Sequence, residues 1–219
     1  MDSFLKQYCS PEWQEFVEFH KVLMEFNENS LIFNEGDVVT GLYIVNKGKV
    51  KVFCTEEDGK ENIIRLAADG EILGHRGFGG DWTYPVSAKT YEKTIVTFIP
   101  LNIFNIVAKA NAEFSYQIMM FFANELRISE EKIIQVPVKN RIAKAILMNY
   151  NVFGADSKDA LKISYTISRK DYASKVNTTY ETVIRVLSEL NKEKIVELEG
   201  KSIRILNFEE LRNLSKWTK

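Results

Sequence analysis

Hydrophobic and polar positions follow a helical period near the C-terminus of this chain. Apolar residues recur there at intervals of three and four and fall on one helix face: Val183, Val186, Leu187 and Leu190. The opposite face carries Tyr180, Glu181, Ile184, Arg185 and Ser188. The pattern predicts an amphipathic helix that packs on a core with its first face and exposes its second.

A shorter helix is predicted just before it. Ser168 is a suitable N-cap, because its hydroxyl can accept a hydrogen bond from Asp171 at the third helical position. Asn177 is a residue type that tolerates left-handed φ, which suits a tight turn. Thr178 and Glu181 match the T-x-x-E capping box, so the second helix is expected to begin at Thr178.

After the second helix, apolar and polar residues alternate instead of recurring with a helical period. Residues 195–198 and 202–206 alternate apolar and polar positions on either side of Glu199-Gly200. Such a pair of runs around a glycine turn predicts a β-hairpin. Two helices, a turn and a hairpin in this order have the layout of a winged helix-turn-helix.

The first half of the chain has a different texture. Residues 11–24 are expected to form a short amphipathic helix. Residues 30–100 contain short β-type runs separated by turns that are marked by Gly36, Gly41, Gly48, Gly59, Gly70 and Gly74. This spacing predicts a compact antiparallel barrel or roll.

A long helix is predicted from about residue 112 to 135. Its apolar seam at intervals of three and four contains Met119, Phe122, Leu126 and Ile133, with Ser129 among them. Further apolar residues make the stripe too broad for one surface, so we expect the helix to pack on the roll and on a second copy of itself. The alternative is a helix enclosed within a larger monomer. Pro137 ends this helix, so we divide the chain into domains 1–136 and 137–219, the second starting with a helix over about 139–150.

Charge separates the two predicted domains. Residues 139–219 contain 16 Lys and Arg against 10 Asp and Glu, whereas the chain totals of 29 and 30 leave 13 against 20 for the remainder. A basic C-terminal domain on an acidic remainder suits polyanion binding by one domain, although chance imbalance between two ordinary domains is the alternative. Two cysteines imply no disulfide framework, and no leader or apolar run long enough to span a bilayer is legible, so a cytoplasmic protein with no membrane partner is expected.

In its order of elements the chain resembles the Crp/Fnr superfamily of bacterial transcription regulators. The motifs that carry the resemblance are Asn34-Glu-Gly-Asp, Leu42-Tyr-Ile-Val-Asn-Lys-Gly-Lys-Val, Asp69-Gly-Glu-Ile-Leu-Gly, Ile167-Ser-Arg-Lys-Asp-Tyr-Ala and Glu181-Thr-Val-x-Arg185. The resemblance implies an α+β fold: an antiparallel, cyclic-nucleotide-binding-like jelly roll, a long dimerisation helix and a C-terminal winged helix-turn-helix domain. It also implies double-stranded DNA with a palindromic site, a second copy of the chain and RNA polymerase as partners.

The sequence departs from the cyclic-AMP-responsive members of that family. They carry a Glu for the ribose and then an Arg-Ser pair for the cyclic phosphate, where this chain has Gly74-His75-Arg76 and Tyr84-Pro85. A buried phosphate needs charge-assisted donors that Tyr and Pro cannot supply. We therefore expect an unknown effector other than cyclic AMP. The candidate effector residues are His75, Arg76, Tyr84, Lys89, Ser129 and Glu130. Alternatively, Arg76 and Lys89 are solvated surface charges and Ser129 is a small polar spacer.

No cofactor or catalytic site is evident from the sequence. Two distant cysteines cannot hold the iron-sulfur cluster of the oxygen-sensing branch, which usually has four Cys ligands. His20 and His75 are the only histidines and lie in different predicted elements, which argues against a cupin-type metal site. Haem ligation by His75 is an alternative, but a lone His in a loop more often forms ordinary hydrogen bonds. No nucleophile-base pair is legible, so no enzyme activity is expected.

The resemblance also implies which residues would meet DNA. Arg185 and Glu181 are expected to read guanine and cytosine edges, and Tyr180 stands where many relatives carry Arg. Ile184 would contact a thymine methyl or shield the helix. Phosphate contacts are expected from Arg169, Thr179, Thr182 and Lys201. The rival hypotheses are a signalling or scaffold module whose winged helix binds protein, and a DNA binder that needs no effector.

Overall fold

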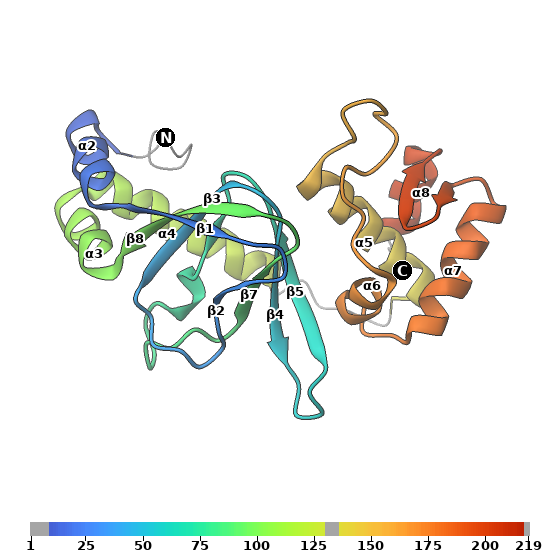
Figure 1. The fold of residues 1–219 in the computed structure, drawn as a ribbon, viewed down its shortest axis with the longest axis horizontal. Helices are drawn as coiled ribbons and strands as arrows, with labels where there is room; N and C mark the ends of the chain where they lie inside the picture. The colour runs from blue at the N-terminus through green and yellow to red at the C-terminus, as the bar shows by residue number, and fades with distance from the viewer. Residues whose placement is uncertain (1–8, 130–135, 217–219) are drawn as a thin grey trace. The chain divides into compact units, whose positions relative to one another are not determined.

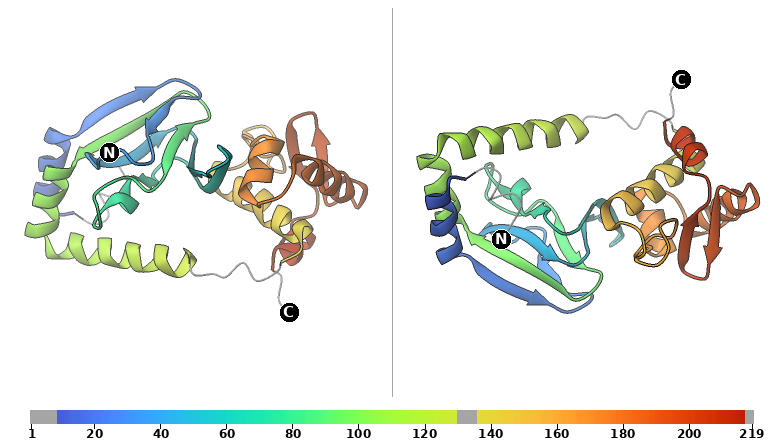
Figure 2. Two further views of the ribbon diagram at one scale, coloured as in Figure 1. Left: turned by 90° about the horizontal axis from the view of Figure 1, so that it is seen from below. Right: turned by 90° about the horizontal axis from the view of Figure 1, so that it is seen from above.

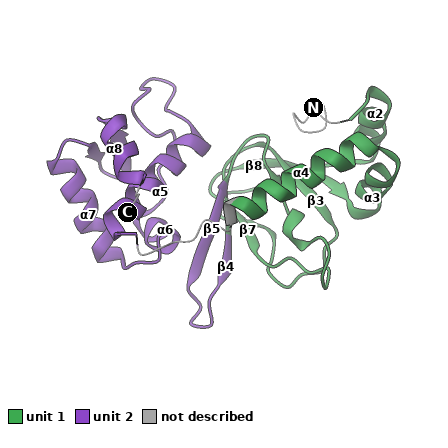
Figure 3. Cartoon of the chain, turned by 180° about the vertical axis from the view of Figure 1, so that it is seen from behind, with its two compact units in different colours: residues 1–52, 67–133 green, residues 53–66, 134–219 purple. Residues whose placement is uncertain are grey.

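The computed structural model describes residues 9–129 and 136–216, in two compact units (Figure 3). Unit 1 comprises residues 1–52 and 67–133, and unit 2 comprises residues 53–66 and 134–219. Within the described ranges, none of the helices is long and apolar enough to cross a membrane.

The N-terminal elements are seen in Figure 1. They are α2 (Pro11–His20), β1 (Val22–Phe26), β2 (Leu31–Phe33), β3 (Gly41–Lys47), β4 (Val50–Thr55), β5 (Glu61–Ala67), β6 (Ile72–Leu73), the 3-10 turn η1 (His75–Gly77), β7 (Ser87–Thr90), β8 (Thr94–Pro100), α3 (Leu101–Ala110) and α4 (Ala112–Ser129). The C-terminal elements are α5 (Val138–Phe153), α6 (Arg169–Lys175), α7 (Tyr180–Lys192), β9 (Val196–Glu199), β10 (Ser202–Ile205) and α8 (Phe208–Ser215).

Two four-stranded sheets form the predicted antiparallel roll. Their strand orders are β1-β8-β3-β6 and β2-β7-β4-β5. In the first sheet, β8 pairs antiparallel with both neighbours, so that Phe98 lies opposite Val22 on one side and Tyr43 on the other. The roll is thus confirmed, and with α4 and the C-terminal helix-turn-helix domain it gives the expected α+β fold.

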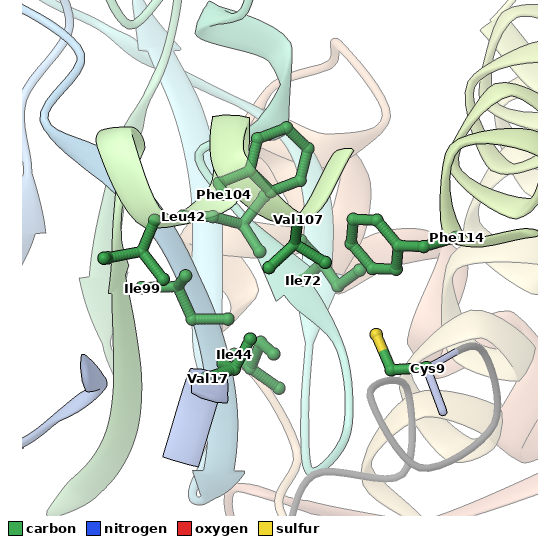
Figure 4. Packing of buried hydrophobic residues seen from close by; sticks show 10 residues of the cluster. Cys9, Val17, Leu42, Ile44, Ile72, Ile99, Phe104, Val107 and Phe114 are labelled. Atoms are coloured by element: carbon green, nitrogen blue, oxygen red, sulfur yellow. The ribbon is translucent and has the colours of Figure 1, made fainter. Parts of the chain in front are cut away.

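The core of unit 1 lies between strands of the first sheet and the helices around them (Figure 4). It contains Cys9, Val17, Leu42, Ile44, Ile72, Ile99, Ile103, Phe104, Val107 and Phe114. Removing each large apolar side chain from water contributes about 1.5–3 kcal/mol to folding. Burial also raises the pKa of the Cys9 thiol to about 11, so that this cysteine stays protonated near neutral pH.

The prediction of one helix over residues 11–24 is wrong at its C-terminal end. The helix α2 ends at His20, and Lys21 already has extended backbone angles. Residues 22–26 instead form β1, in which every residue pairs with β8. The ladder with β8 satisfies backbone groups that a longer helix would have left at the sheet edge, so tertiary pairing overrides the local helical pattern.

Two helices, α3 and α4, follow the last strand of the roll, where the sequence predicts one. Helix α3 was not predicted, although Ile103, Phe104 and Val107 show helical spacing and are buried. The long predicted helix is α4, which runs along one side of the roll (Figure 2) and is described as far as Ser129. Its expected continuation to residue 135 lies outside the described residues.

Candidate nucleic-acid interface

The helix α6 begins where the sequence predicts. The amide of Asp171 donates to Ser168 Oγ at 3.0 Å, and the Ser168 hydroxyl donates to Asp171 Oδ2 at 2.8 Å. Ser168 is therefore the N-cap, and the acidic side chain in the first turn complements the helix dipole.

The turn between α6 and α7 also has the predicted left-handed residue. Asn177 has φ 48°, a conformation that asparagine tolerates better than most residues. Arg141 of α5 donates from Nη1 to the carbonyl oxygen of Val176 at 2.5 Å. This bond ties the turn to the first helix of the domain.

The predicted capping box at Thr178 and Glu181 is wrong by one residue. The N-cap of α7 is Thr179, whose Oγ1 accepts a hydrogen bond from the amide of Thr182 at 3.2 Å. Thr178 remains bonded to the preceding helix, since its amide donates to the carbonyl oxygen of Ala173 at 3.0 Å. Glu181 consequently lies one position too early for a reciprocal capping box and stays exposed.

The two faces of α7 are those that the sequence predicts. Val183, Val186, Leu187 and Leu190 are at most 2% exposed. The opposite face is open, with Tyr180 46% and Ile184 40% exposed. Glu181, Arg185 and Ser188 on the same face are exposed as well. A helix with one anchored face and one free face can enter a DNA major groove.

Arg185 lies on this open face with its guanidinium already oriented. Its Nη1 donates to Oε1 of Glu189, one helical turn further, at 2.7 Å, while the Arg185 side chain stays 64% exposed. Such surface pairs contribute little stability, about 0–1 kcal/mol. The pair restricts the rotamers of Arg185 and leaves further N–H groups to donate to a base edge.

The four predicted phosphate contacts divide into two groups. Thr179 and Thr182 meet at the N-terminus of α7, with their Oγ1 atoms 3.0 Å apart. Lys201 is exposed in the two-residue turn of the β9–β10 hairpin, which we call the wing. Arg169, at the start of α6, directs its guanidinium to the backbone of that turn.

A buried polar network fixes α5, the segment before α6, and α6 itself. Asn149 is fully buried, and its Oδ1 accepts hydrogen bonds from Tyr172 Oη at 2.8 Å and from the amide of Ile167 at 3.1 Å. Its Nδ2 donates to the carbonyl oxygen of Tyr165 at 2.9 Å. Burial raises the pKa of the Tyr172 hydroxyl, which therefore remains a donor at every ordinary pH.

Asn149→Ala is expected to destabilise unit 2 by about 2–5 kcal/mol, because two buried polar groups and one partly buried carbonyl lose their partner and a small cavity forms. Chemical denaturation followed by circular dichroism measures the loss. Asn140→Ala on the same helix is the control, since it removes one partly buried bond to the carbonyl oxygen of Leu214. Equal stability losses in the two variants would contradict the importance of the network.

The candidate effector residue Tyr84 fills the interior of the roll. Its ring stacks on Phe33 with centroids 4.3 Å apart, and Phe33 in turn stacks on Tyr43 at 5.4 Å. Its hydroxyl donates to the carbonyl oxygen of Gly41 at 2.9 Å. Gly74, at φ 83°, allows this close approach, because a Cβ there would lie 3.1 Å from the Tyr84 ring. Tyr84 is thus a packed aromatic residue whose polar atom already has a partner.

His75 and Arg76 link η1 to α4. Arg76 Nη2 lies 3.1 Å from Glu125 Oε2, and His75 Nε2 lies 3.5 Å from the same oxygen. The His75 ring is 4% exposed and meets the Phe121 ring edge-on, with centroids 5.0 Å apart. Glu125 was not among the predicted residues, because an acidic helical residue 49 positions from Arg76 gives no local signal.

The remaining effector candidates do not join this cluster in the described part of the chain. Lys89 lies on β7 opposite Leu31. Ser129 ends the described part of α4, and Glu130 lies outside the described residues. A surface hollow of about 430 Å³ is lined by Cys9, Ser10, Trp13 and residues 110–113, and of the candidates whose side chains the structure describes, His75, Arg76, Tyr84 and Lys89, none lines it.

The predicted seam of α4 is partly open to solvent. Met119 is 56% and Leu126 59% exposed, beside Tyr116 and Met120 at 52% and 47%. Phe122 is only partly exposed, and its ring lies 5.9 Å from that of His75. Ile133 lies outside the described residues. The exposed apolar stripe is therefore carried by Met119 and Leu126, and Phe122 borders the roll.

Two family models match the chain, one in each half. The cyclic nucleotide-binding domain matches residues 23–111, and the Crp-like helix-turn-helix domain matches residues 140–214. The two matches occur in the order in which the roll and the helix-turn-helix follow one another.

Two regulatory proteins are similar to this chain over most of their length. The fumarate and nitrate reduction regulatory protein of Vibrio cholerae is 26% identical over 98% of this chain and 89% of its own. A CRP-like cAMP-activated global transcriptional regulator of Mycobacterium tuberculosis is 26% identical over 86% of this chain and 85% of its own. The structure of FixK2 from Bradyrhizobium japonicum superposes with a TM-score of 0.80 at 21% identity, covering 91% of this chain and 99% of that one. With both domains, their order and the roll-helix-reader architecture in common, the chain belongs to the Crp/Fnr superfamily of bacterial transcription regulators.

Proposed function

We propose that this regulator binds a palindromic DNA site as a homodimer and that α7 is its reading helix. The observation that carries the proposal is the two-faced burial of α7: four anchored apolar residues on one side, and Tyr180, Glu181, Ile184 and Arg185 open on the other. In this role Arg185 donates to guanine O6 and N7, and Glu181 accepts from cytosine N4. Tyr180 and Ile184 flank these two contacts.

Phosphate contacts would come from both ends of the reading surface. Thr179 and Thr182 lie beside the N-terminus of α7, where backbone amides and the helix dipole favour an anion. Lys201 extends from the wing turn and adds a point charge at a second place. Such contacts fix the register of the protein on DNA without reading its sequence. A scaffold module that binds protein through its winged helix would not need base-reading residues on α7 together with phosphate-binding residues beside them.

The exposed stripe of α4 supplies the proposed dimer contact. Met119 and Leu126 occupy the same face of the helix two turns apart, and each is more than half exposed. A second copy of α4 covers such a stripe with matching apolar side chains around a two-fold axis. We infer that domain 1–136 provides dimerisation and domain 137–219 provides DNA binding, in the cytoplasm and together with RNA polymerase.

The effector is inferred to be something other than cyclic AMP. Tyr84 occupies the interior of the roll with its hydroxyl bonded to Gly41, and the nearby Arg76 is paired with Glu125. A phosphate there would have to displace a packed ring and break an ion pair. The link between η1 and α4 through Glu125 also favours the alternative of a regulator that needs no small molecule, since the chain itself joins these two elements.

Selection of bound fragments from random DNA by the purified protein tests the function, in parallel with and without cell extract. The expected product is a palindrome whose half-sites lie about 10–10.5 base pairs apart, centre to centre. Enrichment without extract would support effector-independent binding, and enrichment only with extract would reveal an effector. No sequence enrichment under either condition would refute sequence-specific binding.

Cyclic AMP is expected to give no saturable heat in titration calorimetry and no change in DNA affinity. The physical reason is the missing phosphate clamp at Tyr84-Pro85. Micromolar binding that also tightened DNA affinity would contradict this prediction and would point to Arg76 or Lys89 as the phosphate ligand.

A further inference from the structure

The guanidinium of Arg169 is hydrogen-bonded to the backbone of the wing turn. Its Nη1 donates to the carbonyl oxygen of Lys201 at 2.6 Å, and its Nη2 donates to the carbonyl oxygen of Gly200 at 3.2 Å. The side chain is partly buried, and burial lowers its pKa from the ordinary arginine value. The group nevertheless stays charged, because an arginine pKa lies so far above neutral pH.

The two bonds reach the turn of the wing, which lies beyond its last strand pair, Glu199 and Ser202. Behind the turn, where Leu198 lies opposite Ile203, the amide of Ile203 donates to Thr166 Oγ1 at 3.1 Å, and the amide of Leu198 donates to Asn191 Oδ1 at 3.2 Å. At the tip, Gly200 has φ 59° and Lys201 completes a two-residue turn. Arg169 therefore connects the tip directly to the start of α6.

We propose that Arg169 is a positioning residue that fixes the wing turn and acts on DNA through Lys201. The inference rests on the proposed DNA-binding function and revises the sequence-based expectation that Arg169 is an independent phosphate contact. A lysine on a loose turn loses conformational freedom when it binds, and a turn fixed beforehand avoids part of that loss. The planar guanidinium fork can bond two consecutive carbonyls at once, which an ammonium group does poorly.

A double-variant cycle separates the two roles of Arg169. The operator affinity of the wild type, Arg169→Gln, Lys201→Ala and the double variant is measured against salt concentration. Each lost phosphate contact reduces the salt slope by about one. If Arg169 acts by fixing the turn that carries Lys201, Lys201→Ala and the double variant each lower the slope by about one, while Arg169→Gln lowers the affinity with little change of slope. Arg169→Gln should then cost no further affinity when Lys201 is already Ala. A drop of about two in the double variant, with additive losses of affinity, would overturn the proposal.

Lys170 is the matched control for charge. It is the next residue of α6 and is exposed, with no contact to the wing turn among the described hydrogen bonds. Lys170→Gln should combine additively with Lys201→Ala, because nothing links the two side chains. If Lys170→Gln were coupled to Lys201→Ala as strongly as Arg169→Gln is, the coupling could not be assigned to the Arg169 guanidinium. That result would overturn the proposal.

Amide hydrogen exchange in the free protein tests, without DNA, whether Arg169 fixes the wing turn. Arg169→Gln should speed exchange at Lys201 and Ser202, leave Leu198 and Ile203 protected, and be only partly rescued by Arg169→Lys. Unchanged exchange at the turn would overturn the proposal. If the wild type bound no DNA, the proposed function would fall, and the exchange result would still decide whether Arg169 fixes the wing.

Discussion

Leu126→Glu is expected to convert the protein into a folded monomer and to lower its operator affinity by about 100-fold or more. Leu126 is 59% exposed on the stripe of α4, so the substitution leaves the packing of one copy nearly intact. In the dimer, however, two carboxylates would meet near the two-fold axis, where water is excluded and neither finds a partner. Light scattering measures the mass, and a monomer contacts only one half-site. Circular dichroism must show an unchanged fold.

Asn124→Glu is the control for this substitution. It adds the same charge to α4 at an exposed position away from Met119 and Leu126, beside Arg127, whose Nη2 donates to the Asn124 side chain at 2.9 Å. The control should remain dimeric. If folded Leu126→Glu protein stayed dimeric and bound operator like the wild type, α4 would not be the dimer helix.

Leu126 is a better residue than Phe122 for testing whether α4 forms the dimer contact. Phe122 belongs to the same three-four pattern as Leu126, yet its ring lies 5.9 Å from His75 and 5.8 Å from Phe121. A charge at Phe122 would disturb the roll as well as a dimer. The sequence pattern identified the helix but could not divide its broad apolar stripe between two surfaces.

Elements whose signals are local were predictable. The faces of α7 followed from the spacing of Val183, Val186, Leu187 and Leu190, and the start of α6 followed from Ser168 and Asp171. The start of α7 was missed by one residue, because Thr178 and Thr179 are adjacent and either could cap. The choice depends on the amide of Thr178, which still bonds to Ala173 of the preceding helix.

Features that depend on distant residues were not predictable. Residues 22–26 form a strand because they pair with β8, about 70 positions further along the chain. The stack of Phe33, Tyr43 and Tyr84 and the link from Arg76 to Glu125 likewise join residues far apart in sequence. For this reason the sequence could suggest Tyr84 as a candidate effector residue but could not tell that its ring is packed inside the roll.

Arg185→Ala is expected to remove sequence preference at one base pair in each half-site and to cost about 1–3 kcal/mol per half-site. The guanidinium is oriented by Glu189 at 2.7 Å on the open face of α7, so its loss removes two directed donors without altering the buried face. Repeating the fragment selection with the variant reads out the lost preference. Binding curves on operator and random DNA give the free energies.

Two control substitutions on α7 distinguish the loss of a base contact from the loss of a positive charge and from the loss of the ion pair with Glu189. Lys192→Ala removes an exposed positive charge near the end of α7 and should weaken operator and random DNA alike. Glu189→Gln removes the partner of Arg185 but keeps the guanidinium, so the preference should persist with a small loss of affinity. If Arg185→Ala weakened operator and random DNA equally, as Lys192→Ala is expected to do, Arg185 would be a backbone contact and the base reading would have to come from Glu181 and its neighbours.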